Sequence, residues 1–200
     1  GQNGDGGNVL VFGNQYAIFN GSVTGRGGAQ SGKGGFAEIS GGESVGFNGL
    51  VDMSAANGQN GTLLIDPRVL NIGNGSTNNL LAEIFSGGTT QTVYLNAQAL
   101  ANTLENTNVN LWATEEINTV DDIDLSTWSR RRFIVAGPVI KGITEGDLTL
   151  SATEVNIGGD IILGNGNLNV FDIAEGASPL AFGLIDAPFD IAVETLNLNG

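Results

Sequence analysis

Apolar and polar residues alternate in short runs along most of the chain. Ala37 and Ile39 fall on one face of an extended strand, whereas Glu38 and Ser40 fall on the other. The same alternation recurs over residues 51–54, where Val and Met alternate with Asp and Ser. The pattern predicts many short strands, each with one face in a core and one face towards solvent.

A pattern of apolar, aromatic and glycine positions near the start of the chain returns 28 positions later. The first copy comprises Gly4, Gly6, Gly7, Val11, Gly13, Phe19, Asn20, Gly21 and Val23, and the second comprises Gly32, Gly34, Gly35, Ile39, Gly41, Phe47, Asn48, Gly49 and Val51. A third, partial copy begins at Gly61, where residues 62–65 repeat the strand pattern of residues 36–39. A shorter period of 20 positions relates residues 146–150 to residues 166–170.

Periods of this length, each with two or three short strands, are typical of one turn of a β-solenoid. In such a fold each turn covers the apolar residues that its neighbour leaves exposed. We therefore predict an all-β fold, and within that class a right-handed parallel β-helix.

The middle of the chain has a different period. Ala97, Leu100, Ala101 and Leu104 follow the i, i+3, i+4, i+7 spacing of an amphipathic helix, and Asn96 is a suitable N-cap. We predict one short helix packed against the solenoid. The expected organisation is solenoid coils over residues 1–75, an insertion with the short helix over residues 76–108, and solenoid coils again over residues 109–200.

Composition supports this fold and excludes several function classes. Glycine supplies 32 of the 200 residues, as a chain with many sharp corners requires. The net charge of −14 argues against partners that are nucleic acids or anionic lipid surfaces. No apolar run approaches the roughly 18–20 residues of a membrane-spanning helix, so we expect no membrane insertion. Because the chain has no cysteine and no histidine, it has no disulfide, Cys/His zinc site or His-based triad.

One acidic cluster is a weak candidate for catalysis. Some parallel β-helices cleave polysaccharides as lyases or hydrolases, and a glycosidase needs two carboxylates about 5–10 Å apart. Asp121 and Asp124 could supply the carboxylates, and Arg130 could serve as the base of a lyase. The alternative is a charged surface loop with local Asp–Arg pairing, which contributes little stability. We favour this alternative and expect no enzyme activity, no cofactor and no metal site.

A third hypothesis is a glycan-binding module without catalysis. Aromatic side chains stack on sugar rings when they are exposed, and they fill or cover the core when they are not. The candidates for sugar contact are Tyr16, Tyr94, Trp112 and Trp128.

Three segments in order carry a resemblance to a known family. They are residues 34–41 (Gly-Gly-Phe-x-Glu-x-Ser-Gly), residues 49–55 (Gly-x-Val-Asp-x-Ser-Ala) and residues 61–67 (Gly-Thr-Leu-Leu-x-Asp-Pro). In this block the chain resembles large exoproteins of the filamentous haemagglutinin type, which are exported by two-partner secretion. Ala37 stands where the family pattern more often has Val.

The resemblance implies a right-handed parallel β-helix that is secreted to the bacterial cell surface. It implies an outer-membrane pore transporter as the partner during export, and a role in adhesion or display. A host or cell-surface glycan or protein would then be the adhesion partner. The family's Asn-Pro secretion motifs do not occur here, so we expect a segment downstream of the export signal. Our sequence-based hypothesis is a structural or adhesive segment of a secreted surface exoprotein.

Overall fold

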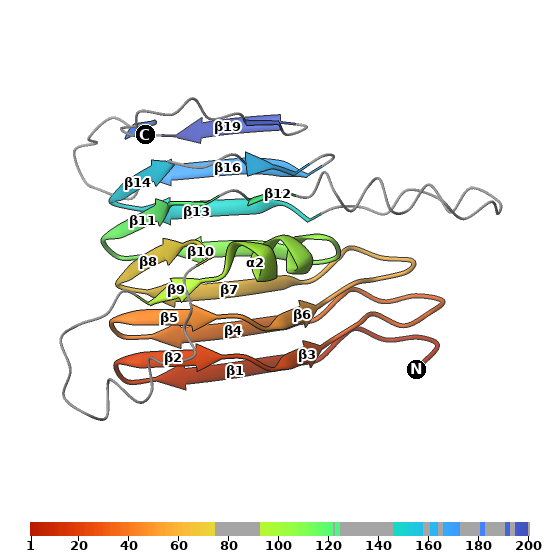
Figure 1. Ribbon diagram of the computed structural model, residues 1–200. Helices are drawn as coiled ribbons and strands as arrows, with labels where there is room; N and C mark the ends of the chain where they lie inside the picture. The colour runs from red at the N-terminus through yellow and green to blue at the C-terminus, as the bar shows by residue number, and fades with distance from the viewer. Residues whose placement is uncertain are drawn as a thin grey trace.

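The computed structural model describes the chain in segments, namely residues 1–74, 93–121, 123–124, 146–157, 161–163, 166–172, 181–182, 191–192 and 195–199. Every pairing between strands in these segments is parallel, and most of the described residues lie in strands or the turns between them. The all-β class predicted from the sequence is therefore confirmed. Figure 1 shows the strands stacked from β1 at the bottom to β19 at the top.

The strands of the described segments form four sheets. Sheet 1 has the order β1 (Asn8–Gly13), β4 (Phe36–Gly41), β7 (Thr62–Pro67), β10 (Asn108–Trp112), β13 (Leu148–Ala152), β16 (Asn167–Asp172) and β19 (Thr195–Asn199). Sheet 2 has the order β17 (Ala181–Phe182), β14 (Glu154–Ile157), β11 (Glu116–Thr119), β8 (Val69–Ile72), β9 (Tyr94–Leu95), β5 (Ser44–Phe47) and β2 (Tyr16–Phe19). Sheet 3 consists of β12 (Ile123–Asp124), β15 (Ile161–Ile162) and β18 (Ile191–Ala192), and sheet 4 consists of β3 (Ser22–Thr24) and β6 (Leu50–Asp52).

The chain visits the sheets in a recurring order. It passes through sheet 1, then sheet 2, then a short strand of sheet 3 or 4, and it returns to sheet 1 beside its previous strand. We call one such passage a rung; β1, β2 and β3 form the first. Between the third and fourth rungs, β9 and a helix interrupt the order.

The internal repeats correspond to the register between rungs. Val11 pairs with Ile39 and Phe19 with Phe47, and these are the matched positions of the 28-residue repeat. Residues 36–39 pair with residues 62–65, and residues 148–150 pair with residues 168–170, as the partial copy and the 20-residue period predict. Sequence self-similarity therefore identified which strands are neighbours.

The strand pattern also identified the core. Ala37, Ile39, Leu63 and Ile65 are each no more than 1% exposed, and they alternate with polar or partly exposed residues. Burying an aliphatic side chain of this size stabilises a fold by about 1.5–3 kcal/mol, so the inward rows of sheet 1 are a main source of stability. Ser40 lies on the outer face as predicted but is buried, and its hydroxyl donates to Glu38 Oε1 at 2.8 Å.

The helix α2 (Ala97–Leu104) confirms the helical stripe in the sequence. Asn96 is its N-cap, and the Asn96 side chain accepts a hydrogen bond from the backbone N of Ala99 at 2.9 Å. Leu100 and Leu104 are fully buried. The helix contacts both β6 of the second rung and β12 of the fourth (Figure 1). It therefore fills the place that a short strand occupies in other rungs, rather than lying on the outside of the stack.

Two threonines join this region to the open edge of β6. Thr107 Oγ1 accepts from the backbone N of Met53 at 2.9 Å and donates to the carbonyl of Val51 at 3.1 Å. Thr103 Oγ1 accepts from the backbone N of Val51 at 3.4 Å. Both threonines are fully buried. Their hydroxyls satisfy backbone groups that a neighbouring strand would otherwise pair.

We expect Thr107→Val to destabilise the protein by about 2 kcal/mol. The substitution keeps the shape of the side chain but leaves the backbone N of Met53 and the carbonyl of Val51 without this partner. Urea unfolding followed by circular dichroism measures the loss. Thr103→Val is the matched control, and its cost should be smaller because it removes one longer bond. Equal stability of Thr107→Val and the unsubstituted protein would show that these bonds do not hold the helix to β6.

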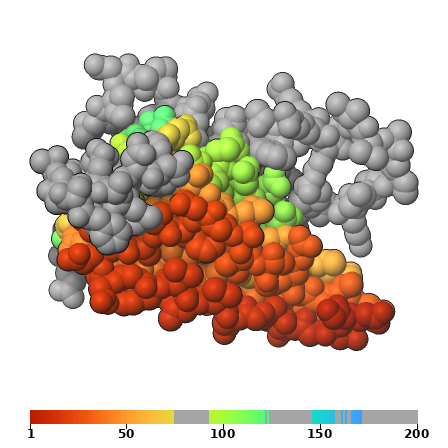
Figure 2. Space-filling model, turned by 60° about the horizontal axis from the view of Figure 1, so that its bottom comes forward, coloured from red at the N-terminus to blue at the C-terminus, as the bar shows by residue number. Residues whose placement is uncertain are grey.

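The first rung forms the N-terminal end of the stack, which Figure 2 brings forward in red. Its strand β1 pairs only with β4 among the described residues, so its other edge is open. Val9 faces the same way as the core residues of later rungs, yet it is 37% exposed. Burial of the inward row therefore depends on having a rung on both sides.

Candidate functional site

The acidic cluster predicted from the sequence falls partly outside the described residues. Arg130 lies outside them, and Asp124 is placed only as a backbone position of β12. Asp121 is described, and its Oδ2 accepts a hydrogen bond from the backbone N of Asn74 at 2.6 Å. Asp121 therefore joins two segments 47 positions apart, which is a structural role. The catalytic pairing of Asp121 with Asp124 and Arg130 stays a prediction.

Charged side chains connect rungs at the corner between sheets 1 and 2. Arg68 Nε donates to Glu43 Oε2 at 2.9 Å, and Arg68 Nη1 donates to Glu115 Oε2 at 2.5 Å. The three residues belong to consecutive rungs, and each side chain is between 44% and 56% exposed. The hydrogen bonds from Arg68 to Glu43 and Glu115 raise the pKa of the guanidinium. The arrangement links three neighbouring rungs through their side chains.

Amide side chains form a second set of links, on the outer face of sheet 2. Asn118 Nδ2 donates to Asn71 Oδ1 at 3.2 Å, and Asn156 Nδ2 donates to Asn118 Oδ1 at 3.0 Å. Asn156 Nδ2 also lies 3.2 Å from Glu116 Oε1. The in-register stack brings these three asparagines together, because β8, β11 and β14 are neighbours. This ladder ties three rungs together through their side chains.

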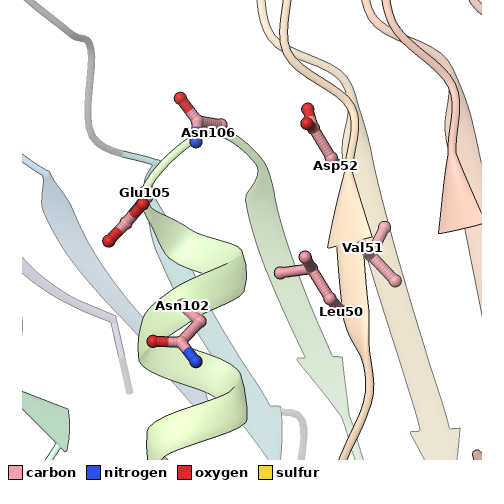
Figure 3. Close-up of a pocket in the computed structure, with 6 residues that line it drawn as sticks. All are labelled: Leu50, Val51, Asp52, Asn102, Glu105 and Asn106. Atoms are coloured by element: carbon pink, nitrogen blue, oxygen red, sulfur yellow. The ribbon is translucent and has the colours of Figure 1, made fainter. Parts of the chain in front are cut away.

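A shallow cavity lies between β6 and the C-terminal end of α2. Its lining residues are Leu50, Val51, Asp52, Asn102, Glu105 and Asn106 (Figure 3). The volume is about 210 Å³, which is below the roughly 300–1,000 Å³ of typical small-molecule sites. In Figure 3, Leu50 points from β6 towards the helix, whereas Glu105 points away from β6.

The carboxylate in this cavity is already engaged. Asp52 Oδ2 accepts from Arg26 Nε at 2.8 Å, and Asp52 Oδ1 accepts from the backbone N of Ser54 at 3.0 Å. Partial burial alone would raise the pKa of Asp52, but the hydrogen bonds from Arg26 and Ser54 outweigh it, so the pKa is lowered. Asp52 therefore stays ionised and paired, which does not suit a general acid.

The outer face of sheet 1 carries exposed aromatic side chains. Trp112, at the end of β10, is 52% exposed, and Phe12 on β1 is 66% exposed. Of the other predicted sugar-contacting aromatics, Tyr16 in β2 and Tyr94 in β9 are half-buried, and Trp128 lies outside the described residues. Among the three candidates that the structure describes, Trp112 is therefore the exposed one.

Two carboxylates lie on the same outer face, at Glu38 and Asp66. Burial, and then the charge of Glu38, raise the pKa of Asp66. The folded state therefore binds the Asp66 proton more tightly than the unfolded chain does. The contribution of Asp66 to stability is greatest at low pH, and it decreases as the pH rises through the raised pKa.

We expect Asp66→Asn to raise the melting temperature at neutral pH by no more than a few degrees. The difference from the unsubstituted protein should shrink as the pH falls below the ordinary pKa of aspartate, because Asp66 is then neutral in both states. Thermal unfolding over a pH series measures the difference in melting temperature between Asp66→Asn and the unsubstituted protein. Added salt should reduce the part due to Glu38, because salt screens exposed charges. A stability difference that does not change with pH would contradict this account.

No helix in the described part of the chain has the length and hydrophobicity needed to cross a bilayer. Within that same part, no three acidic side chains gather closely enough to hold a metal ion. Comparison of the chain with protein-family models, with curated proteins and with solved structures gave no match.

Proposed function

We propose that the chain is a segment of a right-handed parallel β-helix that serves as a structural and adhesive scaffold. The observation that carries this proposal is the recurring order of the sheets. Successive strands of sheet 1 are parallel neighbours, and the chain leaves and returns between them through sheet 2. A parallel crossover of this kind is right-handed in nearly all proteins, which supports the handedness.

The placement of polar groups supports a scaffold rather than an enzyme. Among the described residues, Arg68 and Asn118 bind partners in the rungs before and after their own. Such contacts stiffen a stack and hold its register. The alternative, a polysaccharide lyase or hydrolase, requires Asp121, Asp124 and Arg130 to converge on one cleft. Incubation with acidic polysaccharides, with and without Ca²⁺, would detect cleavage, and its loss in Asp124→Ala would overturn the scaffold proposal.

Duplication of one rung tests the architecture. Three additional copies of residues 8–35, inserted after residue 35, keep the 28-residue register that pairs β1 with β4. The protein should remain folded, and its long axis should increase by about 14 Å, because neighbouring strands are about 4.8 Å apart. Small-angle X-ray scattering measures the length and the cross-section.

The matched control inserts the same three copies without Leu10, which moves the later residues of each copied β1 to the opposite face of the strand. This variant should lose cooperative unfolding, because inward and outward rows no longer align. If both insertions fold equally well, or if the correct insertion widens the particle without lengthening it, the β-helix proposal fails.

Export to the cell surface belongs to the same proposal. It is supported by the resemblance of residues 34–67 to two-partner secretion exoproteins. In the structure, the three motifs of that block lie on β4, on β6 and on β7. Fusion of the chain downstream of an exoprotein export domain, with its pore transporter co-expressed, should place the chain outside the cell. Retention in the periplasm under those conditions would count against the proposal.

A further inference from the structure

One outward row of sheet 1 combines aromatic and polar side chains in register. Phe12 pairs with Ser40, and Ser40 pairs with Asp66. Further along the stack, Trp112 pairs with Ser151, and Ser151 pairs with Phe171. The pairing of Ile65 with Leu111 places Asp66 beside Trp112. We call this set the Trp112 row; its members are Phe12, Ser40, Asp66, Trp112, Ser151 and Phe171.

The row runs across the strands, along the direction in which the rungs stack. Neighbouring strands lie about 4.8 Å apart, so Trp112 and Phe171 are about 10 Å apart, and Phe12 and Trp112 about 14 Å. Trp112 and Phe12 are 52% and 66% exposed, and Phe171 is half-buried. The sheet therefore presents exposed or half-buried aromatic side chains at intervals, with the half-buried Asp66 and Ser151 between them, whereas Ser40 is buried.

This alternation fits the chemistry of a sugar chain. A pyranose ring has an apolar face of C–H groups that stacks on an aromatic ring, and hydroxyls at its edge that need hydrogen-bond partners. Asp66 and Ser151 flank Trp112 in the row, and Asn110 lies exposed on the same strand two positions before it. These groups can accept or donate hydrogen bonds to sugar hydroxyls beside the indole.

Charge selects among glycans. The chain has a net charge of −14, and Glu38 and Asp66 lie on the outer face of sheet 1. Sulfated or uronic-acid polymers would meet repulsion there, whereas a neutral polymer would not.

We propose that the Trp112 row binds an extended neutral polysaccharide, with the polymer running along the stack. This inference deepens the proposed adhesive function. It rests on that proposal because the row runs straight only if the rungs stack as a β-helix. The cavity between β6 and α2 is a weaker candidate for such a ligand, because its volume suits no more than a small fragment. The row lies on an open sheet face and is not confined to a cavity, so it suits a ligand that spans several strands.

Affinity electrophoresis of the whole chain tests the inference. The gels contain a soluble neutral β-glucan, mannan or galactan, and a heparin gel is the anionic comparison. At least one neutral polymer should retain the protein saturably. Trp112→Ala should weaken that retention about tenfold, as the loss of one stacking contact predicts. Trp112→Tyr should keep most of the retention in the gel. Leu50→Ala, which removes an exposed apolar side chain from another sheet, should leave the retention unchanged.

Several outcomes would overturn the inference. These are no retention by any neutral polymer, retention by heparin alone, or retention that Trp112→Ala does not change. Self-association that Trp112→Ala abolishes, without any glycan binding, would assign the row to contacts between copies. Unfolding curves of the variants confirm that each is folded. A rod-shaped protein without glycan binding refutes this inference alone, whereas glycan binding by a protein that is not a rod refutes the architecture alone.

Discussion

Phe47→Ala should destabilise the protein by about 3–5 kcal/mol, which is the usual cost of truncating a fully buried phenylalanine. Phe47 is 0% exposed, and its ring stacks on Phe19 of the preceding rung with centroids 5.9 Å apart and planes inclined by 9°. It also pairs with Leu95, the residue of β9 that joins the second and third rungs. Removal of the ring leaves a cavity where three segments meet, and neighbouring rungs cannot close it without losing their register.

Urea unfolding at neutral pH measures this loss, and Phe12→Ala is the matched control. Phe12 is also an aromatic residue of a strand, but it is 66% exposed, so its truncation should change stability by less than about 0.5 kcal/mol. Phe47→Leu should recover much of the stability because it refills most of the volume. Equal losses in Phe47→Ala and Phe12→Ala would show that the interior between the rungs is not close-packed.

Gly34→Ala should destabilise the protein by about 3 kcal/mol through a backbone contact. A methyl group at Gly34 would lie 1.8 Å from the carbonyl O of Met53 and 2.3 Å from the N of Gly61. These two atoms are hydrogen-bonded to each other at 2.7 Å. Since both belong to the backbone, neither can rotate away, and the second and third rungs must separate locally. Overpacking and the loss of this bond each cost about 1–3 kcal/mol.

Two other glycines provide graded controls. Gly7→Ala should be close to neutral, because a methyl group there meets nothing within 4 Å. Gly6 is the counterpart of Gly34 in the preceding rung, and its methyl group would meet a hydrogen-bonded pair in the same way. Gly6→Ala should cost less than Gly34→Ala, because only one rung has to shift at the open end. The melting temperature should be highest for Gly7→Ala, lower for Gly6→Ala and lowest for Gly34→Ala. Any other order contradicts this account.

The candidate site was less predictable than the fold. The sequence placed Trp112 among four possible sugar-contacting aromatics but had no means of choosing between them. The choice depends on which face of which sheet each ring occupies, and on what covers that face. Arg68 was not predicted to contact Glu43 or Glu115, because the pairs are 25 and 47 positions apart and match no single period.

The alternation of side chains along each strand, together with the 28-residue repeat and its partial copy at Gly61, was enough to predict the strands, the inward rows and the register of sheet 1 over the first three rungs. This is because a strand has only two faces, and a repeated residue in a stack lies beside its copy. The sequence also determined where the helix begins, since Asn96 caps it locally. Only the tertiary structure decided that α2 takes the place of a strand between β6 and β12, and that β9 enters sheet 2 between β5 and β8. Those placements depend on which strand edges stay unpaired when rungs of unequal length stack on one another. No local sequence pattern encodes which edges these are.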